Sequence, residues 1–382
     1  MNISTEYRQC TNCVMDTSDP MIQFDSDGVC DHCHDFTNHV KRHWEKSIND
    51  ENDVNKIIQK IKKDGKNKEY DCIIGLSGGI DSSYMLHVAV TKFNLRPLVF
   101  HVDGGWNSEI AVNNIYSIVD KLGLDLYTEV INWDEMREFQ LAFFKAGVPY
   151  LDIPQDHAFI AALYKYAEKY NIKYIFNGGN FSTECVQYPL KYYYYGTDMI
   201  FLNDIIKKHS NISFESYPFS SIFRHKLYLK YIKGITVVKL LNLIPYFKNN
   251  AIKVLIDQYN YKPYQQKHFE SRFTRFFEGY WLPMRFGFDP RRVQLSSLIL
   301  TGQLQRNEAL EILNKPPLSE EQINEEIYFI ASKLGISIQE LTHYFSIPKK
   351  YYWDYKNQSS VFKFGASVLN LLGIEKTKKR KF

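Results

Sequence analysis

A run of small and hydroxylated residues between Gly75 and Ser83 has the composition of a phosphate-binding loop. It follows the apolar stretch 70–74 and precedes an amphipathic stretch, 80–90, which predicts a strand, a tight turn and a helix N-terminus. Unpaired backbone N–H groups and the helix dipole at such a junction both favour an anion. Two consecutive glycines let the backbone close around phosphate oxygens. Serine hydroxyls can donate to these oxygens, and the Asp81 carboxylate can hold Mg²⁺.

The same loop lacks the features of two other nucleotide sites. No lysine stands between Tyr70 and Thr91, which excludes a Walker-type loop, and the dinucleotide pattern G-x-G-x-x-G is absent. The string from Ser77 to Ser82 instead resembles the PP-loop of ATP pyrophosphatases. That resemblance implies that the loop binds the β,γ-pyrophosphate of ATP as one unit, so that attack falls on the α-phosphate and the substrate becomes adenylated. An ordinary glycine-rich turn between a strand and a helix is the alternative interpretation.

Two Cys-x-x-Cys pairs near the N-terminus have the spacing of a metal site. Cys10 and Cys13 are followed, after sixteen residues, by Cys30 and Cys33. Four thiolates predict a tetrahedral zinc site with a closed coordination shell, and therefore a structural role. Paired disulfides are the alternative, but nothing else in the composition indicates an oxidising compartment.

Apolar strands alternate with amphipathic helices after the loop. The expected elements are strands at 95–102, 124–131 and 173–176 and helices at 108–122, with Ser108 as its N-cap, and 156–170. This alternation predicts an α/β fold with a parallel sheet covered on both faces. Ligands of such sheets bind beyond the carboxyl ends of the strands, where the PP-loop, His101-Val102-Asp103 and Gly178-Gly179-Asn180 all fall. The PP-loop resemblance places adenine near His101 to Asp103. The alternative interpretation of the runs 101–103 and 178–180 is that each is a surface turn.

Composition divides the chain of 382 residues into five parts. They are a zinc-binding module (1–45), a polar helix and linker (46–68), the PP-loop core (69–205), a helical insertion rich in Lys and Tyr (206–262) and a helical C-terminal region for substrate or partner (263–382). A net charge of +4 suits an anionic ligand without requiring nucleic acid. The first residues are polar and no apolar run is long enough to span a bilayer, which predicts a cytoplasmic protein. The basic tail, 376–381, is expected to be solvated or to contact an acidic partner or a membrane.

The segment 267–277 is expected to be a helix with an aromatic face, because its phenylalanines recur at i, i+4, i+7 and i+8. Basic side chains flank that face and continue into the next helix, and the expected substrate-binding set is His268, Arg272, Arg275, Arg291 and Arg292. Guanidinium forks bind phosphate and carboxylate oxygens bidentately, so this set predicts a pocket for an anionic, nucleotide-linked substrate. An aromatic core with a solvated basic edge is the alternative. Glu270 is either a general base or an ion-pair partner.

Longer strings of the sequence resemble N-acetyl sugar amidotransferases over most of residues 7–317, least so from 206 to 262. Besides the PP-loop, the strings that carry the resemblance are residues 10–20 and 24–30, the run His101-Val102-Asp103-Gly104-Gly105-Trp106-Asn107, the block 268–275, Phe286-Gly287 and Arg291-Arg292. Members of this family act on activated sugars in surface-polysaccharide and nonulosonic-acid pathways, such as lipopolysaccharide and O-antigen synthesis. They convert an acetamido group into an acetamidino group.

The resemblance implies that ATP adenylates the acetamido oxygen of a nucleotide-activated sugar. Ammonia then adds to the carbon and AMP departs, so the products are an acetamidino sugar, AMP and pyrophosphate. The residues assigned to ATP, Mg²⁺ and pyrophosphate are Leu76, Ser77, Gly78, Gly79, Asp81, Ser82, Ser83, His101, Val102, Asp103, Gly178, Gly179 and Asn180. Catalysis is assigned to Asp81, Ser77 and Glu270.

The sequence shows no glutaminase signature. Residue 2 is Asn rather than Cys, and neither Cys72 nor Cys185 lies in a Gly-x-Cys-x-Gly turn. A separate glutaminase subunit, with a channelling partner as the resemblance implies, is therefore expected to supply ammonia. The section 206–262 is a candidate docking surface for it.

Two other functions are left open by the residues. A PP-loop tRNA thiolase shares the adenylation step but needs a sulfur-carrying cysteine, a role for which only Cys185 is placed, and the chain has no strong basic surplus for tRNA. A non-enzymatic zinc module fused to a degenerate nucleotide fold is the other, and the intact run from Ser77 to Ser83 argues against it.

Overall fold

The computed structural model describes residues 6–49 and 51–371, and its centre is a five-stranded sheet. The strand order is β3-β2-β1-β4-β5, and each neighbouring pair is parallel. The strands are β1 (Cys72–Gly75), β2 (Pro97–Asp103), β3 (Leu126–Val130), β4 (Tyr174–Phe176) and β5 (Thr236–Val238). The predicted α/β fold with a parallel sheet is confirmed.

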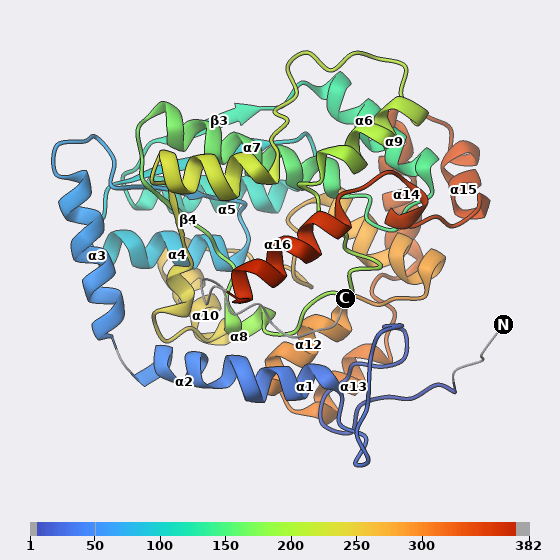
Figure 1. The fold of residues 1–382 in the computed structure, drawn as a ribbon, viewed down its shortest axis with the longest axis horizontal. Helices are drawn as coiled ribbons and strands as arrows, with labels where there is room; N and C mark the ends of the chain where they lie inside the picture. Colours follow the sequence, from blue (N-terminus) through green and yellow to red (C-terminus); the bar gives the residue numbers. More distant parts are fainter. Residues whose placement is uncertain (1–5, 50, 372–382) are drawn as a thin grey trace.

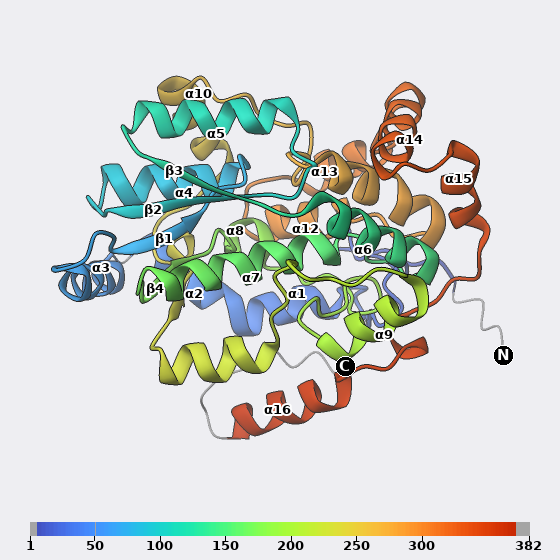
Figure 2. The same ribbon diagram turned by 90° about the horizontal axis from the view of Figure 1, so that it is seen from above.

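Helices cover both faces of the sheet (Figure 1, Figure 2). On one face lie α4 (Ile80–Thr91), α5 (Glu109–Lys121) and α10 (Lys248–Tyr259); on the other lies α7 (Ile153–Lys169), with α6 (Trp133–Ala146) and α9 (Met199–His209) packed beside it. Successive residues of a strand therefore enter opposite cores: Ile74 and Val99 pack toward the first group, and Ile73 and Phe100 toward the second. Burial on both faces explains why the central strands β1 and β4 carry no charged residue.

The N-terminal part of the chain packs against two helices of the C-terminal part, α12 and α13, along the lower edge of the molecule in Figure 1. The N-terminal helices are α1 (Asp31–Asp35), η1 (Phe36–Val40), α2 (Lys41–Asn49) and α3 (Asn52–Gly65). The C-terminal ones are α11 (Arg272–Phe276), η4 (Phe277–Phe286), α12 (Arg291–Leu300), α13 (Arg306–Leu313), α14 (Glu320–Leu334), α15 (Ile338–Ser346), η5 (Tyr352–Asp354) and α16 (Ser359–Leu371). Val14 is buried against Leu295 of α12 and Ala309 of α13, so the N-terminal module rests on the C-terminal helices.

Local signals account for several predicted boundaries. The Ser108 hydroxyl accepts the backbone N–H of Ala111 at 3.2 Å, which confirms it as the N-cap of α5. Helix α7 begins at Ile153 rather than at Asp156, because Pro154 occupies its first turn, where the fixed φ of proline suits a helix.

The predicted helix over 267–277 is wrong in its first half. Helix α11 begins only at Arg272, after the Ser271 hydroxyl accepts the N–H of Thr274 (3.3 Å). The preceding backbone pairs with a distant loop instead: the N–H of Ser108 donates to the carbonyl of Glu270 (2.9 Å). His268 has a φ of +67°, which no helix accommodates. A tertiary contact therefore overrides the helical spacing of the phenylalanines.

The section 206–262 is not wholly helical as expected, because it also supplies the edge strand β5. Its other elements in this range are η2 (Arg224–Ile232), η3 (Leu240–Asn242) and α10. No helix of residues 6–49 and 51–371 is long and apolar enough to cross a membrane. The predicted basic tail, 376–381, lies outside the described residues.

Gly78 shows how tightly the loop after β1 is packed, and we expect its replacement to be costly. It has a φ of +81°, and a Cβ there would lie 2.8 Å from the carbonyl oxygen of Ala111 on α5; Gly123, at φ +62°, has no atom within 4 Å of such a Cβ. Gly123→Ala should lower the free energy of unfolding by about 1 kcal/mol through its positive φ alone. Gly78→Ala should lower it by about 2–4 kcal/mol, because α5 must also move. Equal losses for the two variants in urea titrations would contradict this packing.

Candidate active site and metal centre

The loop after β1 forms a cradle of hydroxyls at the N-terminus of α4. The Oγ atoms of Ser77 and Ser82 lie 3.1 Å apart, and the backbone N–H of Gly79 donates to Ser77 Oγ at 3.2 Å. The Ser83 hydroxyl is buried and has no hydrogen-bond partner among the described residues. Because the positive end of the helix dipole points at the same place, this arrangement suits an anion.

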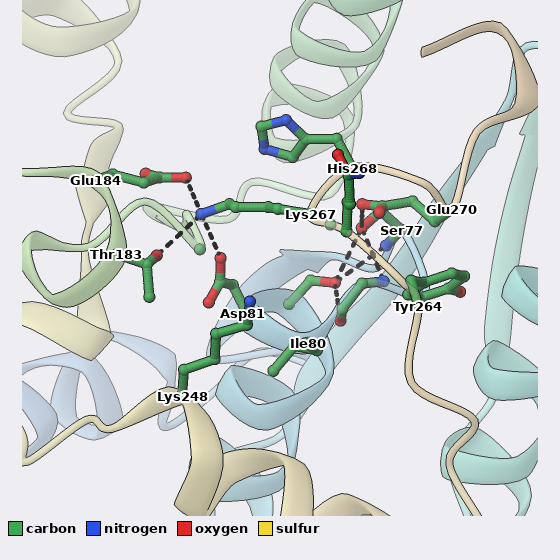
Figure 3. A pocket seen from close by; sticks show the side chains of 15 residues that line it. Ser77, Ile80, Asp81, Thr183, Glu184, Lys248, Tyr264, Lys267, His268 and Glu270 are labelled. Carbon is green, nitrogen blue, oxygen red and sulfur yellow. Dashed lines mark hydrogen bonds and ion pairs between the residues drawn. The ribbon is translucent and has the colours of Figure 1, made fainter. Parts of the chain in front are cut away.

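Two lysines from distant parts of the chain supply the cations that the loop lacks. Lys248 and Lys267 line a cavity of about 250 Å³ together with the loop (Figure 3). Lys267 Nζ lies 2.9 Å from Asp81 Oδ2 and 2.6 Å from Glu184 Oε1. A phosphate chain in this cavity would thus meet both ammonium groups and the N-terminus of α4.

Asp81 is held in its charged form. Burial alone would raise the pKa of Asp81, but the Lys267 ammonium and the Tyr246 hydroxyl, which donates to Oδ1, together bring that pKa below its usual value. Burial and repulsion from Lys267 lower the pKa of the neighbouring Lys248. Asp81 and Glu184 are the carboxylates of this cavity that can hold Mg²⁺ beside the phosphates.

Glu270 stands where this cavity meets a second one. Its Oε1 accepts a hydrogen bond from Ser77 Oγ (3.2 Å), and a Cβ on Gly79 would lie 2.6 Å from the same oxygen. Ser77, His268 and Glu270 line both cavities. Burial raises the pKa of Glu270, which makes its carboxylate a stronger base than that of an exposed glutamate.

The second cavity, of about 430 Å³, opens at the carboxyl ends of β1 and β2. At its edge, His101 Nδ1 lies 2.7 Å from the carbonyl oxygen of Leu76, and Asn107 Nδ2 lies 3.0 Å from His101 Nε2. A carbonyl can only accept, so we assign the proton to Nδ1 and let Nε2 accept from Asn107. Burial lowers the pKa of His101, in agreement with a neutral ring. The imidazole thus joins the PP-loop to the loop after β2.

Buried carboxyl groups occupy the far wall of the second cavity. Asp152 accepts a hydrogen bond from the Thr274 hydroxyl, and Asp156 accepts one from the Tyr150 hydroxyl. Burial, reinforced by repulsion from Asp156, raises the pKa of Asp152 well above its usual range, and burial also raises the pKa of Asp156. Aromatic rings complete the wall, namely Tyr150, Tyr188, Tyr193 and Phe277. The cavity therefore favours a partly apolar ligand with a positively charged or proton-rich end.

His268 places a positive charge beside these acids. Its Nδ1 lies 3.2 Å from Glu278 Oε1, which also accepts from the Tyr193 hydroxyl at 3.1 Å. Burial alone would lower the pKa of His268, but the Glu278 carboxylate raises it to about 9. The unusual backbone conformation at His268 is what turns the ring toward Glu278 rather than along a helix face.

Most residues predicted to bind the nucleotide meet at the two cavities. Those that line at least one are Leu76, Ser77, Gly79, Asp81, Ser82, His101, Val102 and Gly178. Gly78 and Ser83 belong to the loop but do not line the cavities, and Gly179 lies in the turn after β4. Asp103 accepts the N–H of Gly105 (2.8 Å), and Asn180 caps α8 (Phe181–Glu184) by accepting the N–H of Thr183 (2.8 Å).

The first two predicted substrate arginines lie elsewhere. Arg272 and Arg275 each contact Oε1 of Glu326 on α14 at 3.1 Å, and Glu326 is fully buried. Of the expected substrate set, His268 alone lines the cavities. The helix that would have aligned His268 with Arg272 does not extend back to it, so the predicted arginine-lined pocket is not formed here.

The other two arginines are also engaged in structural contacts. Arg291 Nη2 lies 2.7 Å from Asp289 Oδ2 at the start of α12. Arg292 Nη2 lies 3.0 Å from Asp16 Oδ2, and its Nη1 donates to the carbonyl of Val14 at 2.9 Å. Arg292 thus neutralises the buried Asp16 and fastens the N-terminal module, whereas Arg291 pairs with the partly exposed Asp289 within the C-terminal region.

Sequence reasoning missed the cavity residues that come from distant positions. They include Asn107, Tyr150, Asp152, Asp156, Thr183, Glu184, Lys248, Lys267 and Glu278. Tyr246, which donates to Asp81 from outside the cavity lining, was also missed. The acids at 152 and 156 stand at the start of a helix, where a carboxylate is ordinary because of the helix dipole. Lys267 directly precedes the block 268–275, but spacing alone assigned it no partner.

The four predicted metal-ligating cysteines converge. The Sγ atoms of Cys10, Cys13, Cys30 and Cys33 all lie within 4.8 Å of one another, and none forms a disulfide. The closest pairs are separated by 3.6–3.8 Å. Four sulfurs at about 2.3 Å from a tetrahedral zinc ion would lie about 3.8 Å apart, so the donor set fits that metal.

Hydrogen bonds to the backbone around the cysteines hold the cluster against the C-terminal helices. Arg306 of α13 donates to the carbonyls of Cys13 (2.9 Å) and Cys10 (2.8 Å), and Ser296 Oγ of α12 accepts the N–H of Val14 (3.2 Å). A metal ion that fixes these backbone turns also fixes the surface on which α12 and α13 rest.

Two family models match the chain. The one described as LPS biosynthesis protein WbpG-like, C-terminal domain, matches residues 270–369, and the one described as NAD synthase matches residues 51–212. An uncharacterized protein of Methanocaldococcus jannaschii is 31% identical over 97 residues, which cover 25% of this chain and 34% of that protein. The chain thus spans about a third of the length of that curated relative.

Several solved structures are similar to this chain at low identity. An NH3-dependent NAD synthetase from Campylobacter jejuni shares 18% identity over 55% of this chain and 94% of its own, with a TM-score of 0.29. An NMN synthetase from Francisella tularensis shares 15% over 74% and 96%, with a TM-score of 0.30. A U34-tRNA thiolase from Methanococcus maripaludis, with its 4Fe–4S cluster, shares 12% over 74% and 80%, with a TM-score of 0.33.

The His268–Glu278 pair makes a testable prediction about pH. The pKa of His268 is raised from 6.5 to about 9, so the pair stabilises the fold fully below about pH 6.5 and its contribution is lost as the pH rises through about 9. In Glu278→Gln the opposing effect of burial dominates, and the NMR titration midpoint of His268 should fall below 6.5. The distant His209 serves as reference and should titrate unchanged. A midpoint for His268 that does not move would contradict the pairing.

Removal of the metal ligands should loosen the C-terminal helices. We expect Cys13→Ser to release its metal and to lower the free energy of unfolding by several kcal/mol, because binding of a structural metal is coupled to folding. Cys185→Ser replaces a cysteine that is also buried but lies outside the cluster, and it should retain the metal. Metal analysis together with urea titration measures both effects. Full metal content in Cys13→Ser would refute the four-cysteine site.

Proposed function

Because the chain belongs to a PP-loop, amidotransferase-like family of LPS biosynthesis proteins, we propose that it amidates a nucleotide-activated N-acetyl sugar at the expense of ATP. The acetamido oxygen attacks the α-phosphorus, and the bond to the leaving pyrophosphate breaks. Ammonia adds to the activated carbon, and AMP leaves with the former amide oxygen. The products are an acetamidino sugar, AMP and pyrophosphate.

One observation carries this proposal: the PP-loop cavity and the carboxyl-lined cavity meet at Ser77, His268 and Glu270. Two lysines, serine hydroxyls and the α4 N-terminus favour a polyphosphate in the first cavity. Donors held in place before the reaction act most strongly on charge that develops during transfer. We therefore expect the α-phosphorus and the acetamido oxygen to meet at the junction of the two cavities.

The second cavity suits the other half of the reaction. A neutral amide becomes an amidine, which is protonated at neutral pH, so the product carries a new positive charge. The carboxyl groups of Asp152, Asp156 and Glu278 favour that charge. Glu270, whose pKa burial raises, can take a proton from the incoming ammonia as the C–N bond forms.

The cofactors follow from the same residues. Mg²⁺, when bound, neutralises phosphate charge, and Asp81 and Glu184 are the carboxylates placed to hold it. We assign zinc to the Cys₄ cluster, in a structural role, because four thiolates leave no open coordination position. Six free cysteines and a reaction that consumes ATP favour the cytoplasm.

We further propose that a separate glutaminase subunit supplies the ammonia. All six cysteines lie within the described residues, and none lines either cavity. Cys185 is buried, with its Sγ 3.7 Å from the carbonyl oxygen of Ser297. This placement offers no nucleophile for glutamine and also disfavours the tRNA thiolase, which would need a cysteine beside the adenylated atom.

The deciding experiment incubates the protein with ATP, Mg²⁺, ammonium and UDP- or CMP-linked N-acetyl sugars. We expect pyrophosphate and AMP, together with a sugar whose mass falls by the difference between O and NH. Glu270→Gln should lower kcat by about 10²–10⁴, the range of a lost general base. Glu325→Gln, which alters an exposed carboxylate outside the cavities, should leave kcat unchanged. Formation of ADP and phosphate would exclude the proposed chemistry.

A further inference from the structure

A third cavity lies beside the two described above. It has a volume of about 640 Å³, which is within the range of small-molecule sites. Three distant segments line it: residues 19–21 of the N-terminal module, residues between Glu184 and Tyr195, and residues 352–353 of η5. The cavity therefore exists only when the N-terminal module and the C-terminal region are both packed against the core.

Shared side chains connect this cavity to the other two. Glu184 lines both the first and the third cavity, whereas Tyr188 and Tyr193 line both the second and the third. The two tyrosine rings lie 4.2 Å apart, and their hydroxyls are held by Gln294 and Glu278, each at 3.1 Å. A ligand that is longer than the third cavity can thus extend past fixed rings toward the site of adenylation.

Aromatic rings with an open side line the third cavity. Trp353 is 52% exposed, and the ring that stacks on it at 4.7 Å, Tyr351, lies outside the cavity lining. Tyr352 is likewise stacked on Tyr194, with 4.2 Å between centroids, and Tyr194 also lies outside the lining. The rings are therefore held in place by their neighbours and still present surface to the cavity. Such rings suit a planar aromatic ligand, because every nucleobase has a face that can stack.

Lys191 gives the same cavity a positive charge that no acid neutralises. Burial and repulsion from Lys349 lower the pKa of Lys191, and no carboxylate of residues 6–49 and 51–371 opposes this effect. A partly buried ammonium group without an acidic partner favours an anion. Phosphate oxygens are suitable partners, because a lysine can meet them as a compact point charge.

The acids of the three cavities favour the third one for phosphates of a substrate. The two acids that line it already have partners: Asp19 Oδ2 lies 3.0 Å from His32 Nε2, and Glu184 Oε1 lies 2.6 Å from Lys267 Nζ. The carboxyl groups on the far wall of the second cavity would instead repel phosphates. The arginines that the sequence pattern assigned to an anionic substrate lie outside all three cavities.

We propose that the third cavity binds the nucleotide of the activated sugar, with its base against Trp353 and its phosphates at Lys191. This assignment rests on the proposed amidation, since it supplies the part of the substrate that the first two cavities do not accommodate. A nucleotide combines a planar base with negative charge, and the cavity combines flat rings with an ammonium group. The sugar extends past Tyr188 and Tyr193 to the junction, where its acetamido oxygen meets ATP.

Titration calorimetry of the full chain with UDP and with CMP tests this proposal. The analogue α,β-methylene-ATP, which cannot release pyrophosphate, keeps the first cavity filled. We expect at least one of the two nucleotides to bind. Trp353→Leu should weaken this binding about tenfold, because the stack on the base is lost. Lys191→Met should also weaken it about tenfold, because a charged hydrogen bond to phosphate is lost. Neither variant should change the affinity for α,β-methylene-ATP.

Matched variants outside the three cavities provide the controls. Tyr328→Leu removes a ring that is 68% exposed. Lys169→Met removes a lysine whose Nζ lies 5.2 Å from the Tyr166 ring centroid, much as Lys191 Nζ lies 4.7 Å from that of a tyrosine. Both controls should bind UDP and CMP like the unmodified chain, and all four variants should keep its thermal unfolding midpoint. Equal losses in the two lysine variants would overturn the proposal. So would a loss of α,β-methylene-ATP affinity in Trp353→Leu, since the cavity would then hold adenine.

Steady-state amidation separates this inference from the proposed function. Trp353→Leu and Lys191→Met should each raise the KM of the nucleotide sugar about tenfold and leave the KM of ATP unchanged. If the sugar is amidated and its KM is the same in both variants, the nucleotide site is refuted while the function stands. If UDP or CMP binds in a manner that depends on Trp353 but no sugar is amidated, the site stands and the function is refuted.

Discussion

The contact of the largely buried Lys267 with Asp81 and Glu184 is the interaction on which the architecture of the site depends. The Lys267 side chain is only 13% exposed, so its ammonium must find anions inside the protein. Because these side chains are only partly exposed, the contact contributes more to stability than an ion pair in full solvent, which is typically worth about 0–1 kcal/mol. Asp81 belongs to the loop after β1, and Lys267 lies almost two hundred residues later. Their contact holds the C-terminal half of the chain over the N-terminus of α4.

The contact between Lys267 and Asp81 of the loop after β1 explains why residues 263–271 do not form a helix. The carbonyl of Glu270 accepts the N–H of Ser108, and the N–H of Arg272 donates to the carbonyl of Trp106 (2.9 Å). The backbone thus satisfies its hydrogen bonds against the loop after β2, and Glu270 reaches the junction of the two cavities as a result. The two lysines line only the first cavity, whereas Asp152, Asp156 and Glu278 line only the second.

The N-terminal cysteine module also holds the C-terminal helices in position. It buries Val14 between α12 and α13, and Arg292 and Arg306 bind its backbone and its Asp16. These helices follow directly on the segment that carries Lys267 and Glu270. Arginines whose sequence pattern indicated substrate binding thus neutralise buried carboxylates, because an unpaired Asp or Glu in the interior would cost more than the pair does.

The sequence by itself determined the parallel sheet, the phosphate loop after β1 and the four-cysteine cluster. Each depends on residues close together in the chain: apolar runs of fixed period, consecutive glycines between a strand and a helix, and two Cys-x-x-Cys pairs. His101 and Gly178 were also placed correctly at the sheet's carboxyl edge, because parallel strands all end there. The tertiary structure alone decided which side chains from distant segments join the loop residues at the two cavities. Lys248, Lys267 and Asp152 come from three separate segments, and no local spacing encodes their distance from Asp81 or Ser77. Buried acids also had to be neutralised. Glu278 holds His268, Glu326 holds Arg272 and Arg275, and Asp16 holds Arg292, and the local sequence pattern indicated none of these pairs.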